Sequence, residues 1–381
     1  MVKRRSLLVA AAAVATVLVR GLAGASPGWQ AQQSPPPSQP PIETAAERFK
    51  NLQVLGDIPA EELPQTMHFF RASLGVHCDY CHVTEGQHYE RDDRPAKAKA
   101  RQMIRLVRRL NAEQFDGKPV VTCNTCHRGS VSPEAVPTVA QGLFPDTTHT
   151  PVLPVPPTAA AVLDRYIEAL GGRKAMESVC RRVSTGVLLE IRIDHAGTAQ
   201  AVAVNRGRQV SLEMVQNLDG TAQVRIGEAE SDEVLQIVGR DGGTVSSQQL
   251  NRALTEQELA RLRAELDLRR DLALRARAES MSVSTGLLDG KAVDVLEGTG
   301  ADGRLRRWYF DQESGLLLRR IVLTEMALGA DPEQTDYEDY RDVDGVKVPF
   351  TVKRSFLDDN HLGTTRRFSS IQDFAGDACP R

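Results

Sequence analysis

Two short motifs restrict the fold of this chain more than any other feature of its sequence. They read CDYCH at residues 78–82 and CNTCH at residues 123–127, so each has two cysteines two residues apart and a histidine directly after them. At this spacing two thiols can add to the vinyl groups of one haem while the histidine ligates its iron. The sequence therefore predicts two covalently bound c-type haems, with these attachment cysteines and histidine ligands: Cys78, Cys81, Cys123, Cys126, His82 and His127.

Three other uses of paired cysteines fit this sequence less well. A zinc ribbon usually separates its two pairs by about 15 to 20 residues, whereas 41 residues lie between Cys81 and Cys123. A thioredoxin-like redox pair belongs in a βαβ setting, which the surrounding sequence lacks. A disulfide within each pair would be strained. Covalent haem attachment is therefore the favoured interpretation.

The N-terminus has the pattern of a secretory signal. Basic residues 3–5 precede an apolar run from Ser6 to Val19, and residues 23–25 offer a small-residue cleavage site. The apolar run is short for a bilayer span, so a retained N-terminal anchor is the weaker alternative. We therefore expect a signal peptide at residues 1–25 and a periplasmic protein, in a compartment that permits disulfides.

Composition divides the rest of the chain. Residues 26–43 are rich in Pro, Gln and Ser, which predicts a disordered tether. Residues 44–130 hold both motifs and are expected to form a mostly helical dihaem cytochrome c domain. A proline-rich linker follows at residues 131–157, and residues 158–381 are expected to form a second, β-rich domain.

Short segments of the second domain alternate apolar and charged residues, which is typical of half-exposed antiparallel strands. Asp344-Gly345 predicts a two-residue hairpin turn, and Thr255 with Glu258 predicts the start of a helix. We expect an α+β fold in which a curved antiparallel sheet covers one or two helices. The expected strands are 187–194, 201–205, 293–297, 305–311, 316–324, 346–353 and 367–371.

Each iron needs a sixth ligand, and a methionine thioether suits a low-spin haem. A predicted helix before each motif carries one methionine, Met67 or Met103, in an apolar row. The two rows are Leu63, Met67, Phe70, Leu74 and Ala96, Ala100, Met103, Val107, Leu110. Methionine at helical spacing is often an ordinary core residue, so both roles stay open on this pattern alone.

Three histidines compete with the methionines as iron ligands. His68 points about 100° away from Met67 around the helix, and His77 directly precedes Cys78. His88 lies in a polar loop and is the main rival, because histidine is a common metal ligand.

From Asn51 to Ser130 the sequence resembles the multihaem cytochrome c subunit of photosynthetic reaction centres. The resemblance rests on TM at residues 66–67, ARQM at 100–103 and the VTC…CHRG ending at 121–129, in units of helix, turn and CxxCH. It implies that Met67 and His82 ligate one iron, and that Met103 and His127 ligate the other. The photosynthetic members have four such units and this chain has two, so the photosynthetic role is not expected to transfer.

Two six-coordinate irons would leave no open position for a substrate, which favours single-electron transfer. We therefore expect an electron carrier and not an enzyme. The alternative is a haem enzyme, a peroxidase or reductase, in which one axial ligand is labile.

The C-terminal half resembles the periplasmic lipoprotein carriers, whose half-open barrel holds acyl chains. The resemblance implies a lipid or hydrophobic-ligand carrier as a further alternative, beside a structural or docking module. Cys180 and Cys379 either form a disulfide after export or stay unpaired.

The net charge of −3 provides no basic field for nucleic acid. The segment Arg94–Arg109 nevertheless has seven basic residues and no acidic one. A solvated helix face is the plain interpretation. The functional one is that part of the segment pairs with haem propionates and the rest steers an acidic periplasmic redox partner. A membrane-associated electron donor or acceptor is also compatible with an exported carrier.

Overall fold

The computed structural model describes residues 42–133, 157–195, 202–205, 209–227, 234–247, 251–300, 302–357, 361–376 and 379. The predicted signal peptide lies outside these residues, as do most of the predicted tether and linker. In the described part of the chain, no helix has the length and apolarity to cross a membrane.

Helices make up most of the regular structure of the N-terminal part, and local sequence sets their ends. Pro95 starts the long helix α3, where its missing N–H costs no hydrogen bond. Gly75 ends α2 in the left-handed conformation that favours glycine, with φ 65°. The elements are α1 (Ala45–Arg48), α2 (Glu62–Leu74), η1 (Cys78–Tyr80), η2 (Glu85–Gln87), α3 (Pro95–Gln114) and α4 (Cys123–His127).

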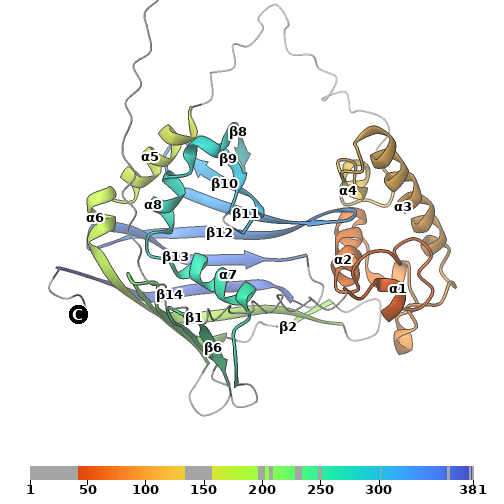
Figure 1. Cartoon of the computed structure of the whole chain (residues 1–381), viewed down its shortest axis with the longest axis horizontal. Helices are drawn as coiled ribbons and strands as arrows, with labels where there is room; N and C mark the ends of the chain where they lie inside the picture. Colours follow the sequence, from red (N-terminus) through yellow and green to blue (C-terminus); the bar gives the residue numbers. More distant parts are fainter. Residues whose placement is uncertain are drawn as a thin grey trace, which may run out of the picture. The chain divides into compact units, whose positions relative to one another are not determined.

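One large antiparallel sheet dominates the C-terminal part (Figure 1), in the strand order β7-β6-β5-β4-β3-β1-β14-β13-β12-β11-β10-β9-β8, with β2 paired to β1. Its ends, β7 and β8, do not pair with each other, so the sheet is open. The helices are α5 (Ala159–Ala169), α6 (Arg173–Ser178), α7 (Glu256–Leu266), α8 (Arg270–Arg275) and η3 (Ala278–Ser280). The strands are β1 (Val179–His195), β2 (Val202–Asn205), β3 (Gln209–Asn217), β4 (Ala222–Ile226), β5 (Val234–Val238), β6 (Gly243–Ser246), β7 (Asn251–Ala253), β8 (Ser282–Leu288), β9 (Lys291–Thr299), β10 (Leu305–Asp311), β11 (Leu317–Met326), β12 (Gly329–Val343), β13 (Val346–Ser355) and β14 (His361–Ala375).

The expected combination of N-terminal helices and a C-terminal antiparallel sheet is confirmed in outline. Asp344 and Gly345 both have positive φ and join β12 to β13, as a two-residue hairpin requires. Thr255 and Glu258 form the capping box at the start of α7. The strands between residues 209 and 253, and β8 and β12, were not among those predicted.

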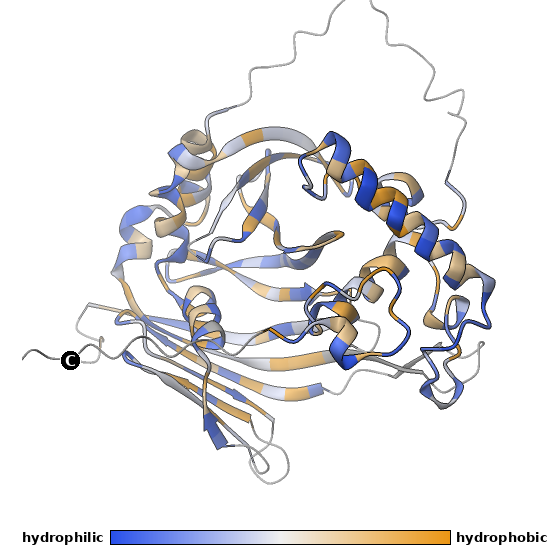
Figure 2. Cartoon of the chain, turned by 45° about the vertical axis from the view of Figure 1, so that its right-hand side comes forward, coloured by the Kyte–Doolittle hydropathy of each residue, from blue (hydrophilic) through white to orange (hydrophobic). Residues whose placement is uncertain are grey.

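The core of the sheet region forms where α5 and α8 meet the strands. Val162 and Leu163 of α5 are fully buried, and Tyr166 packs against Phe310 of β10 with ring centroids 5.0 Å apart. Hydrophobic and hydrophilic residues alternate along many of the strands (Figure 2), so one face of the sheet can pack while the other meets water.

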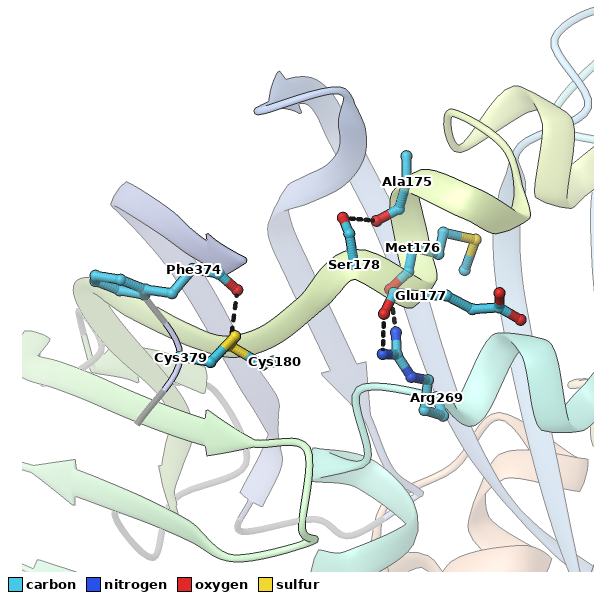
Figure 3. The surroundings of a disulfide bond; sticks show 8 residues. All are labelled: Ala175, Met176, Glu177, Ser178, Cys180, Arg269, Phe374 and Cys379. Carbon is cyan, nitrogen blue, oxygen red and sulfur yellow. Dashed lines mark hydrogen bonds between the residues drawn. A yellow bond between two sulfur atoms is a disulfide. The ribbon is translucent and has the colours of Figure 1, made fainter. Parts of the chain in front are cut away.

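A disulfide joins Cys180, near the start of β1, to Cys379 at the C-terminal end, with Cα atoms 5.8 Å apart (Figure 3). This is the first of the two alternatives that the sequence left open. The bond closes a separation of 199 residues and so lowers the conformational entropy of the unfolded chain. In the chain-entropy model this stabilises the folded state by about 5 kcal/mol. Nearby, the Arg269 guanidinium donates to the carbonyls of Met176 and Glu177 and holds the end of α6 (Figure 3).

The turn between β11 and β12 contributes to the core of the N-terminal helices. Leu328 is 2% exposed and belongs to the cluster that contains Leu63 and Ile104. The backbone N–H of Ala327 donates to the Glu62 carboxylate at 2.7 Å. At Gly329 an added Cβ would lie 2.7 Å from Cζ of Phe69, so the outer edge of that ring lies against bare backbone. The sheet and α2 therefore stabilise one another through this hairpin.

Replacing Leu328 with alanine should lower the free energy of unfolding by about 2–5 kcal/mol, because a buried leucine loses its contacts and leaves a cavity. Leu287 of β8 is 77% exposed, so Leu287→Ala should change stability by less than about 0.5 kcal/mol. Denaturant titrations of both variants measure the difference. Equal stabilities would show that the hairpin does not support the helices.

Candidate functional site

The first CxxCH motif presents its histidine in a defined orientation. His82 Nδ1 lies 3.0 Å from the backbone carbonyl oxygen of Tyr89. A carbonyl only accepts, so Nδ1 carries the proton and Nε2 is left with its lone pair. Burial lowers the pKa of His82, with the charges of Lys97 and Arg101 adding to the shift. The neutral imidazole, which is the form that binds iron, is thereby favoured.

The second motif repeats this arrangement on a different element. α4 begins after Thr122, whose backbone N–H donates to the Thr125 hydroxyl at 3.0 Å. His127 Nδ1 lies 2.9 Å from the carbonyl oxygen of Ser130. The lone pair of His127 Nε2 is therefore also available to a metal ion. A hydrogen bond of this kind to the second ring nitrogen is what orients metal-binding histidines in general.

The four motif cysteines are not joined in disulfides. Cys81 and Cys123 are half-buried, whereas Cys78 and Cys126 are exposed. Burial raises the pKa of Cys123 to about 11 and also raises the pKa values of Cys78 and Cys81. The thiols of Cys78, Cys81 and Cys123 therefore stay protonated near neutral pH.

The residues around the motifs fit a haem. Each motif offers two thiols and one imidazole nitrogen, which is the donor set for thioether attachment and iron ligation. An open groove of about 640 Å³ runs beside the first motif. Apolar side chains, the Arg94 guanidinium, the Asp79 carboxylate and the His77 imidazole share its wall. The apolar part suits a flat ring, and Arg94 suits its acidic substituents. The residues that line it are Val76, His77, Asp79, Tyr80, Arg94, Pro95 and Ala96.

Met67 lies on α2 and is half-buried against the helical core. The predicted row of Leu63, Met67, Phe70 and Leu74 is only partly right, because the most buried residues of α2 are Leu63, Thr66, Phe69 and Ser73. Phe69 faces the β11–β12 hairpin, a contact that the local sequence does not encode. Met67 lies at the margin of this buried row.

Met103 lies on a different face of α3 from the buried residues Arg101, Ile104 and Asn111. Its row, Ala96, Ala100, Met103 and Val107, is half-buried, and Leu110 is 37% exposed. An apolar row that protein covers only partly suits contact with a flat macrocycle.

The rival histidines differ in their surroundings. His88 is exposed, and its Nδ1 lies 3.4 Å from the Glu90 carboxylate. His77 lines the groove beside the first motif, and His68 lies on α2 next to Met67. Nothing in these contacts assigns an iron to any of the three.

Several basic residues of the Arg94–Arg109 segment turn toward acidic groups of the same chain. Arg101 and Lys97 bind the Asp92 carboxylate, at 2.9 Å and 3.0 Å, and together they hold the pKa of Asp92 well below its ordinary value. Lys97 also donates to the Tyr89 carbonyl at 2.8 Å, the group that orients His82. The sequence did not indicate that Lys97 contacts the same carbonyl as His82.

The remaining members of the segment differ in their pairing. Arg108 binds Asp57 at 2.9 Å, and Arg109 approaches Glu113 at 3.9 Å. Within the described residues, Arg94, Lys99 and Arg105 have no acidic partner. Charge available to an outside partner is therefore concentrated on these three side chains.

The two motifs are held side by side by backbone contact. The N–H of Gly129, just after the second motif, donates to the Ser73 carbonyl at 2.8 Å. A Cβ added to Gly75 would lie 2.2 Å from the Gly129 carbonyl oxygen. Only glycine permits this approach, which places the end of α2, just before Cys78, against the end of α4 (Figure 1).

Gly75→Ala should therefore lower stability and reduce haem incorporation. The positive φ alone costs about 1 kcal/mol, and the clash with Gly129 adds to it. Gly117 is the matched control, because its φ is 78° and an added Cβ would contact nothing within 4 Å. Denaturant titration and haem content are measured for both variants. If the Gly75 and Gly117 variants have equal stability and equal haem content, the contact between the motifs supports neither folding nor haem incorporation.

Comparisons with known proteins match part of this chain to one family. Residues 25–154 match the family model described as the photosynthetic reaction centre cytochrome C subunit. The photosynthetic reaction center cytochrome c subunit of Thermochromatium tepidum is 35% identical over 94 residues, 24% of this chain and 23% of that protein. Cytochrome c-554 of Chloroflexus aurantiacus is 37% identical over 86 residues, 21% of this chain and 20% of that protein.

Solved structures are similar to this chain at low identity. A LolA superfamily protein from Nitrosomonas europaea has 13% identity and a TM-score of 0.38, covering 59% of this chain and 98% of its own. An outer membrane lipoprotein-sorting protein domain from Vibrio parahaemolyticus has 12% identity and a TM-score of 0.38, covering 57% and 94%.

The resemblance of residues 51–130 to reaction-centre cytochrome c subunits is thus confirmed. The chain spans only about a quarter of the length of the curated relatives that it matches.

Proposed function

We propose that this chain is an exported dihaem c-type cytochrome that passes single electrons. The observation that carries the proposal is the repeated geometry of His82 and His127, each with Nδ1 bound to a backbone carbonyl and Nε2 free for iron. The relatives are named as cytochrome c proteins, which supports the same class of function.

In this proposal each haem is attached by one cysteine pair and has one histidine and one methionine as axial ligands. Met67 and His82 would serve the first iron, and Met103 and His127 the second. The bound haem supplies one-electron redox chemistry. The protein orients each imidazole through its carbonyl hydrogen bond and partly buries each thioether, and a methionine–histidine pair favours a raised potential.

The domain division is part of the proposal. Residues 44–130 would carry the haems and residues 158–381 would form the second domain, joined by the linker at 131–157. A periplasmic location is supported by the disulfide between Cys180 and Cys379, because such bonds persist in oxidising compartments.

The partner is proposed from charge. Arg94, Lys99 and Arg105 remain available to steer an acidic redox protein, and Arg94 also borders the groove beside the first motif. Because relatives are reaction-centre subunits by name, a membrane-associated donor or acceptor is the partner class to test first. The comparisons favour neither the haem enzyme nor the lipid carrier.

Replacing both cysteines of one motif should leave a protein with one covalent haem. Cys123→Ala with Cys126→Ala removes the second attachment, and Cys78→Ala with Cys81→Ala removes the first. Mass spectrometry of the denatured protein counts covalent haems, and the expected numbers are two in the native chain and one in each double variant. A native chain with fewer than two would contradict the dihaem proposal.

Replacing a ligating methionine with leucine keeps the side-chain volume and removes the sulfur. Met67→Leu or Met103→Leu should lower the potential of one haem by a measurable part of the ~0.8 V range that axial ligands control. Each variant should also gain rapid carbon monoxide binding at one iron. Met281→Leu, in the C-terminal part, is the control. If the haem potentials of both test variants equal those of the native protein, methionine ligation is excluded. Rapid carbon monoxide binding by the native protein would instead favour the haem enzyme.

A further inference from the structure

Four neighbouring strands bring polar side chains into one row across the sheet. Arg320 of β11 pairs with Thr335 of β12, Thr335 with Arg354 of β13, and Arg354 with Thr364 of β14. Directly paired residues of antiparallel strands project from the same face. All four line one cavity of about 120 Å³, together with Arg366 from the same face of β14 and Glu265 from α7.

The arginines of this cavity are not equally satisfied. Arg366 binds Glu265 at 2.5 Å, and Arg354 binds Glu333 at 2.6 Å. Among the described residues, no carboxylate oxygen forms a direct ion pair with Arg320, although its charge acts on Glu265. Its hydrogen bond to the Thr335 hydroxyl is a long one, 3.5 Å. The buried Nε atoms of Arg320 and Arg354 also have no hydrogen-bond partner within the described part of the chain.

Charge in the cavity is unbalanced toward the positive. Arg320, Arg354 and Arg366 face Glu265 and Glu333, and Glu333 is shared with Arg261 on α7. Burial alone would raise the pKa of Glu265. The positive charges of nearby arginines, Arg366 and Arg320 foremost, have the larger combined effect, so the pKa is lowered. The residues that line the cavity carry more cationic than acidic side chains: Arg182, Arg270, Arg320, Lys347, Arg354 and Arg366 against Glu265, Asp267 and Asp271. This excess of positive charge favours an anion.

The size of the cavity limits what that anion can be. A cavity of about 150 Å³ holds a single benzene molecule, and drug-sized ligands need roughly 300 Å³ or more. At about 120 Å³ the space accepts a small group and not a pair of acyl chains. Guanidinium forks bind carboxylate and phosphate oxygens in pairs, and a half-buried arginine without an acidic partner favours such a group.

We propose that this cavity binds an oxyanion, a phosphate or carboxylate group, held by Arg320 and Arg354 with the Thr335 hydroxyl beside them. The group is either free or the head of a small amphiphile. The site is independent of the haem motifs and goes beyond electron transfer.

Isothermal titration of the full holoprotein with inorganic phosphate, and separately with dihexanoyl phosphatidic acid, tests this inference. Binding of either probe should weaken at least tenfold in Arg320→Gln. Arg320→Lys keeps the positive charge but loses the paired N–H donors of the guanidinium. Its affinity for the probe should therefore lie between those of the native protein and Arg320→Gln. The matched control is Arg240→Gln, because Arg240 is 72% exposed and pairs with Asp219 away from the cavity.

Arg320-dependent binding of phosphate supports a free oxyanion, and Arg320-dependent binding of the lipid alone supports a head-group site. The inference is overturned if neither probe binds the native protein, or if Arg320→Gln and Arg320→Lys bind as the native protein does. Thermal unfolding with and without the probe gives a second readout, since a ligand that binds the folded state raises its melting temperature. The Arg320→Gln protein should show little of that rise.

Discussion

The close approach of Gly75 and Gly129 is the constraint on which the arrangement of the two CxxCH motifs depends. Each glycine lies within three residues of a CxxCH motif, and a side chain at position 75 would collide with the carbonyl of residue 129. The contact fixes the end of α2 against the end of α4, so the two motifs share one rigid support. Two redox centres attached there would be neighbours because of backbone packing, without any side-chain bridge between them.

The β11–β12 hairpin extends this support into the sheet. Its turn places Leu328 in the core of the helices and Gly329 against Phe69 on α2, the helix that carries Met67. The strands of the same hairpin carry Arg320 and Thr335 at the polar cavity. The β11–β12 hairpin thus contacts the helix that carries Met67 and also contributes residues to the proposed oxyanion site. The N-terminal helices depend on this hairpin for part of their core.

Local patterns predicted what local chemistry determines. Alternation predicted seven of the strands, and Asp344-Gly345 predicted a hairpin turn that joins β12 to β13. The attachment cysteines that the CxxCH spacing predicts remain a prediction. Features that depend on distant partners were not predictable in this way. The buried row of α2 follows the hairpin of another part of the chain, and Arg101 and Lys97 turn inward because Asp92 lies beside them. β12 is rich in acidic residues, and its pairing is set by β11 and β13 more than by its own alternation.

Electron paramagnetic resonance of the oxidised holoprotein tests the central claim most directly, because magnetic coupling reports whether two ferric haems are neighbours. The account predicts a spectrum that differs from the sum of the two one-haem variants, in which only the cysteines of one motif are replaced. A native spectrum equal to that sum would contradict adjacent haems on the joined α2 and α4 motifs.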